Sequence, residues 1–279
     1  MNSNVTRRVL TLGLATISLA SGSAWAHEAD DLYAAMEGGK CEPAATTLQA
    51  RAKSGVAMAQ RRLGMAYFNG VCVKANEKAG AAWMRKAAEQ GDMDARNEVG
   101  SLYLEGNGVS KDPKEAMRWF RLAAEQGDAH AQYSLAQMYY FAEGVPKDDR
   151  EAVKWVRKAA VQGHAGAQAS LGAALIHGEG MVLRDRREGA EWLRKAAMQG
   201  NTTGQNNLAG AYENGWGVPR NMVLAYAWVL LSTSEAKPGS EGMTLRVEMG
   251  NLLNGKQRAE SERLARGWKV GQDLTTAMK

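Results

Sequence analysis

The chain has 279 residues, a formal net charge of +5 and an ordinary apolar content of 45%. Few prolines (5), many glycines (31) and the lack of short alternating apolar runs favour helices separated by glycine turns over strands. Lysine and arginine are interleaved with aspartate and glutamate, so the sequence has no basic stripe for phosphates, and nucleic acid is not expected as a partner.

The first 26 residues carry the three parts of a secretory signal peptide. Residues 2–8 end in the basic pair Arg7-Arg8, residues 9–19 form a short apolar stretch, and Ala24-Trp25-Ala26 offers a small-x-small cleavage site. We therefore predict cleavage after Ala26 and export, to the periplasm or out of the cell, by the general or the twin-arginine route. The alternative is a buried N-terminal helix. No other apolar run is long enough to give the mature chain a transmembrane segment.

Residues 27–56 are typical of a degenerate repeat that caps the N-terminal end. The pattern predicts one short helix over 31–38 and a second over 43–54, with Cys41 in the connecting loop.

Five tandem repeats follow. Tryptophans recur at intervals of 36, 36, 37 and 36 residues, and glycines that close the units keep the same spacing. These tryptophans are Trp83, Trp119, Trp155, Trp192 and Trp228, and the glycines are Gly91, Gly127, Gly163 and Gly200. The predicted units span 57–92, 93–128, 129–164, 165–201 and 202–237. The single insertion of the fourth unit falls in its turn, between Gly180 and Asp185.

Each unit is predicted to be a pair of helices joined by a glycine turn. Ala59, Leu63 and Tyr67 are spaced by four and share one face of the first helix. A glycine beside that leucine position would let a neighbouring helix approach closely; it occurs as Gly64, Gly100 and Gly172. An Asp or Asn cap lies seven residues before each tryptophan. Because one unit cannot bury its tryptophan alone, we expect stacked units to bury it.

The combined pattern Ala-x-x-x-Leu-Gly-x-x-Tyr, Gly-x-Gly-Val-x-x-Asp, Ala-x-x-Trp and Lys-Ala-Ala-x-Gln-Gly resembles the Sel-one-like repeat family, and the second unit shows it best. The resemblance covers about residues 57–237 and implies an all-α fold, a right-handed α-solenoid similar to tetratricopeptide repeats. Three units depart from the pattern: Cys72 and Ala142 replace turn glycines, and Leu175 replaces the tyrosine.

Two features of the flanks complete the predicted solenoid. Cys72 lies in the turn of the first unit, and turns of adjacent units stack on one edge, so export predicts a disulfide between Cys41 and Cys72; the alternative is two buried thiols. Residues 238–279 predict C-terminal capping helices over 243–253 and 257–268, with Leu264, Ala265 and Trp268 covering the last repeat.

A solenoid offers a long concave face, which by analogy with tetratricopeptide units is lined by the first helices. Candidate partner-binding residues on that face are Arg61, Arg62, Asn97, Glu98, Tyr133, Gln137, Tyr140, Asn206 and Asn207. The mixed polar and aromatic set favours a protein or peptide partner. The prediction is a non-catalytic interaction scaffold in the cell envelope, with roles in envelope assembly, signalling or host contact implied by the resemblance.

Other chemistry is weakly represented. Ser234-Glu235-Ala236-Lys237 matches the S-x-x-K motif of penicillin-interacting enzymes, but no S-D-N or K-T-G motif follows, so an envelope hydrolase stays the alternative. Binding of glycan such as peptidoglycan through groove aromatics is a further alternative. The histidines lack metal-ligand spacing; we expect no metal, no cofactor and no enzyme activity, and a capping or surface role for His130 and His164.

Overall fold

The computed structural model describes residues 22–179 and 182–278, and over these ranges the chain forms fourteen α-helices and one short 3₁₀ helix, with no strand. Most of the predicted signal peptide, residues 1–21, and Gly180 and Met181 of the fourth turn lie outside the described residues. Among those that are described, no helix is both long and apolar enough to cross a bilayer.

The helices come in consecutive pairs. The five repeat units are α3 (Ala57–Asn69) with α4 (Glu77–Glu89), α5 (Met93–Glu105) with α6 (Pro113–Glu125), α7 (Ala129–Phe141) with α8 (Asp149–Val161), α9 (Ala165–His177) with α10 (Arg186–Met198), and α11 (Thr202–Asn214) with α12 (Met222–Ser232). The turn of the fourth unit, residues 178–184, is one residue longer than residues 106–111 of the second.

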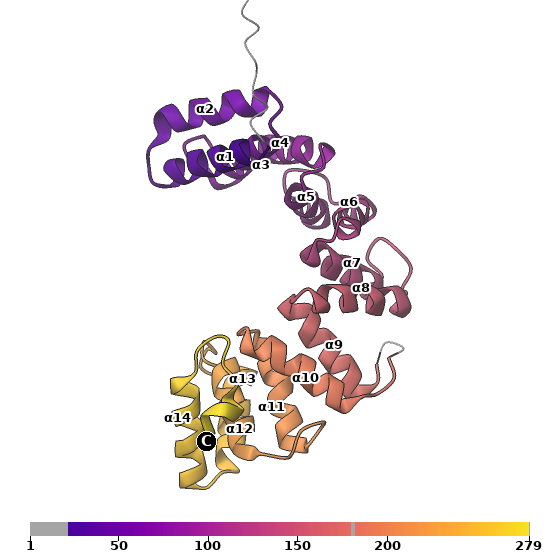
Figure 1. The fold of residues 1–279 in the computed structure, drawn as a ribbon, viewed down its shortest axis with the longest axis vertical. Coiled ribbons are helices and arrows are strands. Elements are labelled where there is room, and N and C mark those ends of the chain that lie inside the picture. The colour runs from indigo at the N-terminus through magenta and orange to yellow at the C-terminus, as the bar shows by residue number, and fades with distance from the viewer. Residues whose placement is uncertain (1–21, 180–181, 279) are drawn as a thin grey trace, which may run out of the picture.

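The pairs follow one another along an arc, which makes the molecule an α-solenoid (Figure 1). At one end lie α1 (Gly22–Glu37) and α2 (Cys41–Lys53), and at the other α13 (Glu241–Asn251), α14 (Gly255–Gly267) and η1 (Leu274–Met278). The ends pack on the repeats: Tyr33 and Met36 join the core of the first unit, and Trp268 meets Trp228 edge-to-face with ring centroids 6.0 Å apart.

Local sequence explains where the repeat helices begin and end. Each second helix begins after an Asp or Asn whose side chain accepts a backbone N–H, as Asp112 does from Glu115, and this satisfies a donor that the helix leaves unpaired. Each first helix ends at a residue in the left-handed region. That residue is Gly in four units and Ala142, with φ 60°, in the third.

Within a unit, the side chain after the tryptophan packs on the small residue beside the leucine. A Cβ added to Gly100 would lie 2.7 Å from the Phe120 ring, and one added to Gly172 would lie 2.7 Å from Cγ of Leu193. The glycines inside these helices therefore allow the close packing that the sequence predicts. Burial of the tryptophans is less uniform than predicted, because Trp83 and Trp192 are only partly buried whereas Trp119, Trp155 and Trp228 are buried.

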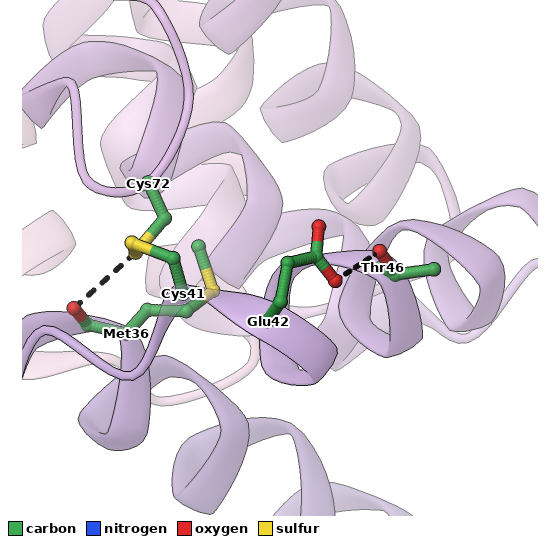
Figure 2. The surroundings of a disulfide bond; sticks show 5 residues. All are labelled: Met36, Cys41, Glu42, Thr46 and Cys72. Atoms are coloured by element: carbon green, nitrogen blue, oxygen red, sulfur yellow. Dashed lines mark hydrogen bonds between the residues drawn. A yellow bond between two sulfur atoms is a disulfide. The ribbon is translucent and has the colours of Figure 1, made fainter.

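The cysteines form the disulfide predicted from stacked turns (Figure 2), with 5.2 Å between their Cα atoms. Cys41 is the first residue of α2, ahead of a break at Glu42, whose φ of −108° and ψ of 135° are not helical. In the next units the turn glycine at the place of Cys72 packs against the start of the preceding second helix: a Cβ on Gly144 would lie 2.6 Å from the Pro113 carbonyl oxygen. The disulfide thus occupies a recurrent contact between units.

The junctions between units share a second contact, made by a side chain on the first helix. Gln132 donates to the Ala124 carbonyl of the preceding unit, and Gln162 at the end of the same unit donates to Oε1 of Gln132. Equivalent bonds to the preceding unit come from Gln60, Arg96, Gln168 and Gln205. Each junction therefore has a fixed polar bond beside its apolar core.

Candidate partner-binding groove

Three hollows follow the first helices, and eight of the nine predicted partner-binding residues line them. We call this row of hollows the first-helix groove. Arg61, Asn97 and Glu98 line the hollow between α3 and α5; Tyr133, Gln137 and Tyr140 line the pocket between α7 and α9; Asn206 and Asn207 line the hollow between α9 and α11. In each case a second helix supplies the floor, through Met84, Val156 and Leu193 in turn.

Unit one does not present free cations to this groove. Arg61 is buried, with Nε 3.2 Å from Asp92 and Nη2 3.1 Å from Asp94 of the next unit. Arg62 lies outside the hollows, where its guanidinium bonds Asp30 at 2.5 Å and covers the Tyr33 ring at 5.6 Å. The two arginines that the sequence predicts on this face therefore form ion pairs with neighbouring elements of the solenoid.

The hollow between α3 and α5 is acidic. Asp94, Glu98, Glu105 and Asp128 line it, and Arg61 is its one arginine among the described residues. Partial desolvation raises the pKa of Glu98 above its ordinary value; Arg61 acts in the opposite direction, and Asp94 and Glu105 add to the rise. Such crowding of carboxylates means that a positive group placed there would be attracted by several of them.

The pocket between α7 and α9 is the apolar part of the groove, with a volume of about 270 Å³. Its walls are rings and small side chains: Tyr133 and Tyr140 from α7, Ala152 and Val156 from α8, Ala173 and Ala174 from α9. At its rim Phe141 is 64% exposed and packs edge-to-face on Tyr140, with centroids 5.0 Å apart. Sequence reasoning missed Phe141, although its position directly after Tyr140, a predicted groove residue, could have indicated it.

The floor of this pocket is a smaller residue than the floors of the hollows in units one and four. In unit four, Ile176 reaches the place where Gly189 has no Cβ, and Leu193 fills the space beside Gly172. Unit one uses Phe68 against Gly80 in the same way. Unit three has alanines in place of these glycines and Val156 on the floor. At the position of Phe68 and Ile176 it has Tyr140, which stays 45% exposed.

Unit five has small side chains at the same positions as unit three, but its floor is covered. It has Ala209, Ala225 and Val229, and Val229 is fully buried. Beside Val229 and Ala209, the hollow is lined by Leu245 and Met249 of the C-terminal helix α13. The chain itself thus shows what covers a floor of this kind, namely aliphatic side chains from a following segment.

A histidine pair joins the acidic hollow to the apolar pocket. Nε2 of His164 lies 3.2 Å from Nδ1 of His130, and the His164 ring lies 4.7 Å from that of Tyr133. Nδ1 of His164 accepts the Ala167 N–H and caps α9, so the role expected for this histidine is capping. Burial, and then His130, lower the pKa of His164, while Asp128 and a backbone hydrogen bond raise it.

The S-x-x-K motif lies on the turn between α12 and α13. Both Ser234 and Lys237 are exposed, and their backbone groups are used in turn hydrogen bonds, Ser234 N–H to the Leu231 carbonyl and the Lys237 carbonyl from Ser240. A nucleophile normally needs a close base and an enclosed site, and neither residue lies within the groove. Within the described ranges no group of three or more His, Cys, Asp or Glu side chains could hold a metal ion.

The Sel1 repeat family model matches residues 57–92, 94–128, 129–164, 165–201 and 202–234. Crystal structures of two proteins are similar over most of the chain. One is c5321, a protective antigen of uropathogenic Escherichia coli with an SLR fold, 34% identical with a TM-score of 0.75, over 84% of this chain and 50% of that one. The other is a Sel1 repeat protein from Oxalobacter formigenes, which is 28% identical with a TM-score of 0.72, over 88% of this chain and 99% of that one.

The chain therefore spans about half the length of the Escherichia coli antigen and nearly all of the Oxalobacter protein. No curated protein matches the sequence.

Proposed function

The chain belongs to the Sel1 repeat family, whose members generally serve as non-catalytic protein-interaction scaffolds, and from this premise we propose that it binds a protein partner along the first-helix groove. The observation that carries the proposal is the row of three hollows lined by unlike residues from successive units. Specific recognition needs such a surface, because a groove of identical repeats could not distinguish one register of a partner from another.

We further propose that the protein works outside the cytoplasm, as an envelope scaffold or a secreted one. The supporting features are the signal-like residues 1–26 and the Cys41–Cys72 disulfide, which persists in oxidising compartments. Cleavage after Ala26 would remove the start of α1 and leave a helix from His27 onward. The intact mass of the chain purified from the periplasm, before and after thiol alkylation, tests this: a mass from Met1, or two alkylated cysteines, contradicts it.

Site-specific photo-crosslinking in cells tests the groove. A crosslinker replaces Gln137, which is exposed in the pocket between α7 and α9, and the control replaces Lys154, which is exposed on α8 outside the groove. We expect a discrete adduct from Gln137 alone, whose partner, identified by mass spectrometry, binds the purified chain again. Equal adducts from both positions, or none from Gln137, contradict the proposal. Sedimentation of the chain with cell wall would instead favour the glycan alternative.

A further inference from the structure

We propose that the partner segment is a cationic peptide with a leucine or methionine anchor: the anchor enters the pocket between α7 and α9, and its lysines or arginines lie along the carboxylates of the groove. This inference rests on the proposed function and specifies the chemical class of the partner segment.

The anchor is inferred from the space that unit three leaves open. Ala136, Ala152 and Val156 form the floor and walls of a pocket of about 270 Å³ that Tyr140 and Phe141 border. The corresponding floor of unit five is covered by Leu245 and Met249 of α13, which are unbranched at Cβ and aliphatic. A partner that supplies a side chain of this kind to unit three would reproduce a contact that the fold already makes at its own end.

The charge of the partner is inferred from the charge of the groove. The chain as a whole is positive, with a net charge of +5, yet the hollow between α3 and α5 and the pocket between α7 and α9 are lined by Asp94, Glu98, Glu105, Asp128, Asp149 and Glu179. Two cations are already paired here: Arg61, the one described arginine or lysine on these linings, with Asp92 and Asp94, and Lys147, which lies over the Tyr140 ring, with Asp149 at 3.3 Å. Glu98, Glu105, Asp128 and Glu179 keep the groove negative. A negative groove on a positive protein attracts cationic segments and repels acidic ones.

The two parts of the groove lie within reach of one short peptide. Asp128 caps α7 and lines the acidic hollow, and Tyr140 near the other end of α7 lines the apolar pocket. Twelve positions of helix correspond to about 18 Å, which roughly six residues of extended peptide cover.

Fluorescence anisotropy with synthetic peptides tests the inference on the full mature chain. The probe is a short fluorescein-labelled peptide with one leucine flanked by lysines, compared with the same peptide carrying alanine for leucine or glutamates for lysines. We expect saturable binding of the first, at least about tenfold weaker binding without the leucine, and no measurable binding of the acidic peptide. Affinity should fall as salt is raised, because exposed charges are screened.

Two protein variants separate the anchor from the charges. Val156→Leu places in unit three the residue that fills unit four, and it should weaken the leucine peptide about tenfold, whereas Val161→Leu, at a 72% exposed site elsewhere on α8, should not. The double variant Glu98→Gln with Glu105→Gln should weaken the lysine peptide and reduce its dependence on salt. Circular dichroism melts establish that each variant is folded before it is compared.

Three outcomes overturn the inference: equal or tighter binding of the acidic peptide, unchanged affinity of folded Val156→Leu, and no binding of any peptide. If Val156→Leu does not fold, the leucine-to-alanine peptide decides the same point. The crosslinking from Gln137 distinguishes this failure from that of the proposed function, since a partner captured there while no cationic peptide binds overturns the anchor and charge alone.

Discussion

Units three and four are neighbours whose second helices have the same length and begin after an Asp cap, and they differ in the residues on their floor. Unit four has Gly172 and Gly189, and Leu193 and Ile176 occupy the space between its helices. Unit three has alanines at both positions and Val156 on the floor, and its pocket is walled by apolar side chains, whereas the hollow over Leu193 of unit four is lined by Asn206, Asn207 and Glu213.

The difference shows how a repeat protein can carry specificity without changing its frame. Where two glycines let the helices approach, large side chains fill the space between those two helices. Where alanines replace the glycines and the floor residue is smaller, an apolar pocket leaves room for a side chain from elsewhere. Unit five supports this interpretation, because its similar floor is covered by α13.

The largest effect is expected from the tryptophans of the two units. Trp155 is 7% exposed and Trp192 is only partly buried, although each donates its indole N–H to a glutamate and lies under a lysine. Trp155→Ala should lower the free energy of unfolding by about 3–5 kcal/mol and Trp192→Ala by clearly less. Urea denaturation of both variants measures this; an equal or larger loss for Trp192→Ala would contradict the packing described for unit four.

A methyl group between the close helices of unit four should be the next largest perturbation. A Cβ on Gly172 would lie 2.8 Å from the Gly189 carbonyl oxygen, so Gly172→Ala forces the helix backbones apart at a cost of about 1–3 kcal/mol. The control is Gly210→Ala in α11, where a Cβ meets nothing within 4 Å and better helix propensity should stabilise by up to about 1 kcal/mol. If both substitutions changed the free energy of unfolding in the same direction, the glycine of unit four would have no packing role.

The turn after the first helix gives a smaller and reciprocal test. Ala142 of unit three has φ 60° and Gly178 of unit four has φ 77°, and a side chain in this region is unfavourable. Ala142→Gly should therefore stabilise unit three by about 1 kcal/mol, and Gly178→Ala should destabilise unit four by a similar amount. Differential scanning calorimetry should show melting temperatures that move in opposite directions, and a shift of both in one direction refutes the reciprocity.

The junction between the two units should respond to pH. Burial and the facing His130 lower the pKa of His164, with Asp128 acting against them and Tyr133 stacked on the ring. The folded state thus favours neutral His164, so its contribution is present above about pH 6.5 and is lost as pH falls through the lowered pKa. Melting temperatures from pH 7.5 to 5 should fall less for His164→Asn, which keeps a cap like Asn201 of unit five; an unchanged slope would remove His164 as the cause.

Much of the fold follows from the sequence because the determinants are local and repeated. An N-cap such as Asp112 or a turn glycine such as Gly106 acts within one helix end, and five copies make its register plain. The repeat period placed eight of nine candidate residues on one groove for the same reason.

What the sequence did not predict depends on contacts between units. The pairing of Arg61 with Asp92 and Asp94 joins residues of different units, and a periodic pattern does not reveal it. The pocket of unit three depends on the joint sizes of Ala136, Ala152 and Val156, which face one another only after the helices pack. Likewise, the interior place of the residue after each tryptophan became visible only from the approach of the helices, as with Phe120 on Gly100.

Methyl NMR of valine-labelled chain, titrated with the leucine–lysine peptide, shows whether the apolar pocket between α7 and α9 receives the anchor. Val153 and Val156 line the pocket, and Val161 and Val229 lie outside it and serve as internal controls. We expect saturable shifts of the Val153 and Val156 methyl signals with a common dissociation constant and unchanged signals from Val161 and Val229. Saturable binding that leaves the Val156 methyls unmoved would contradict this expectation.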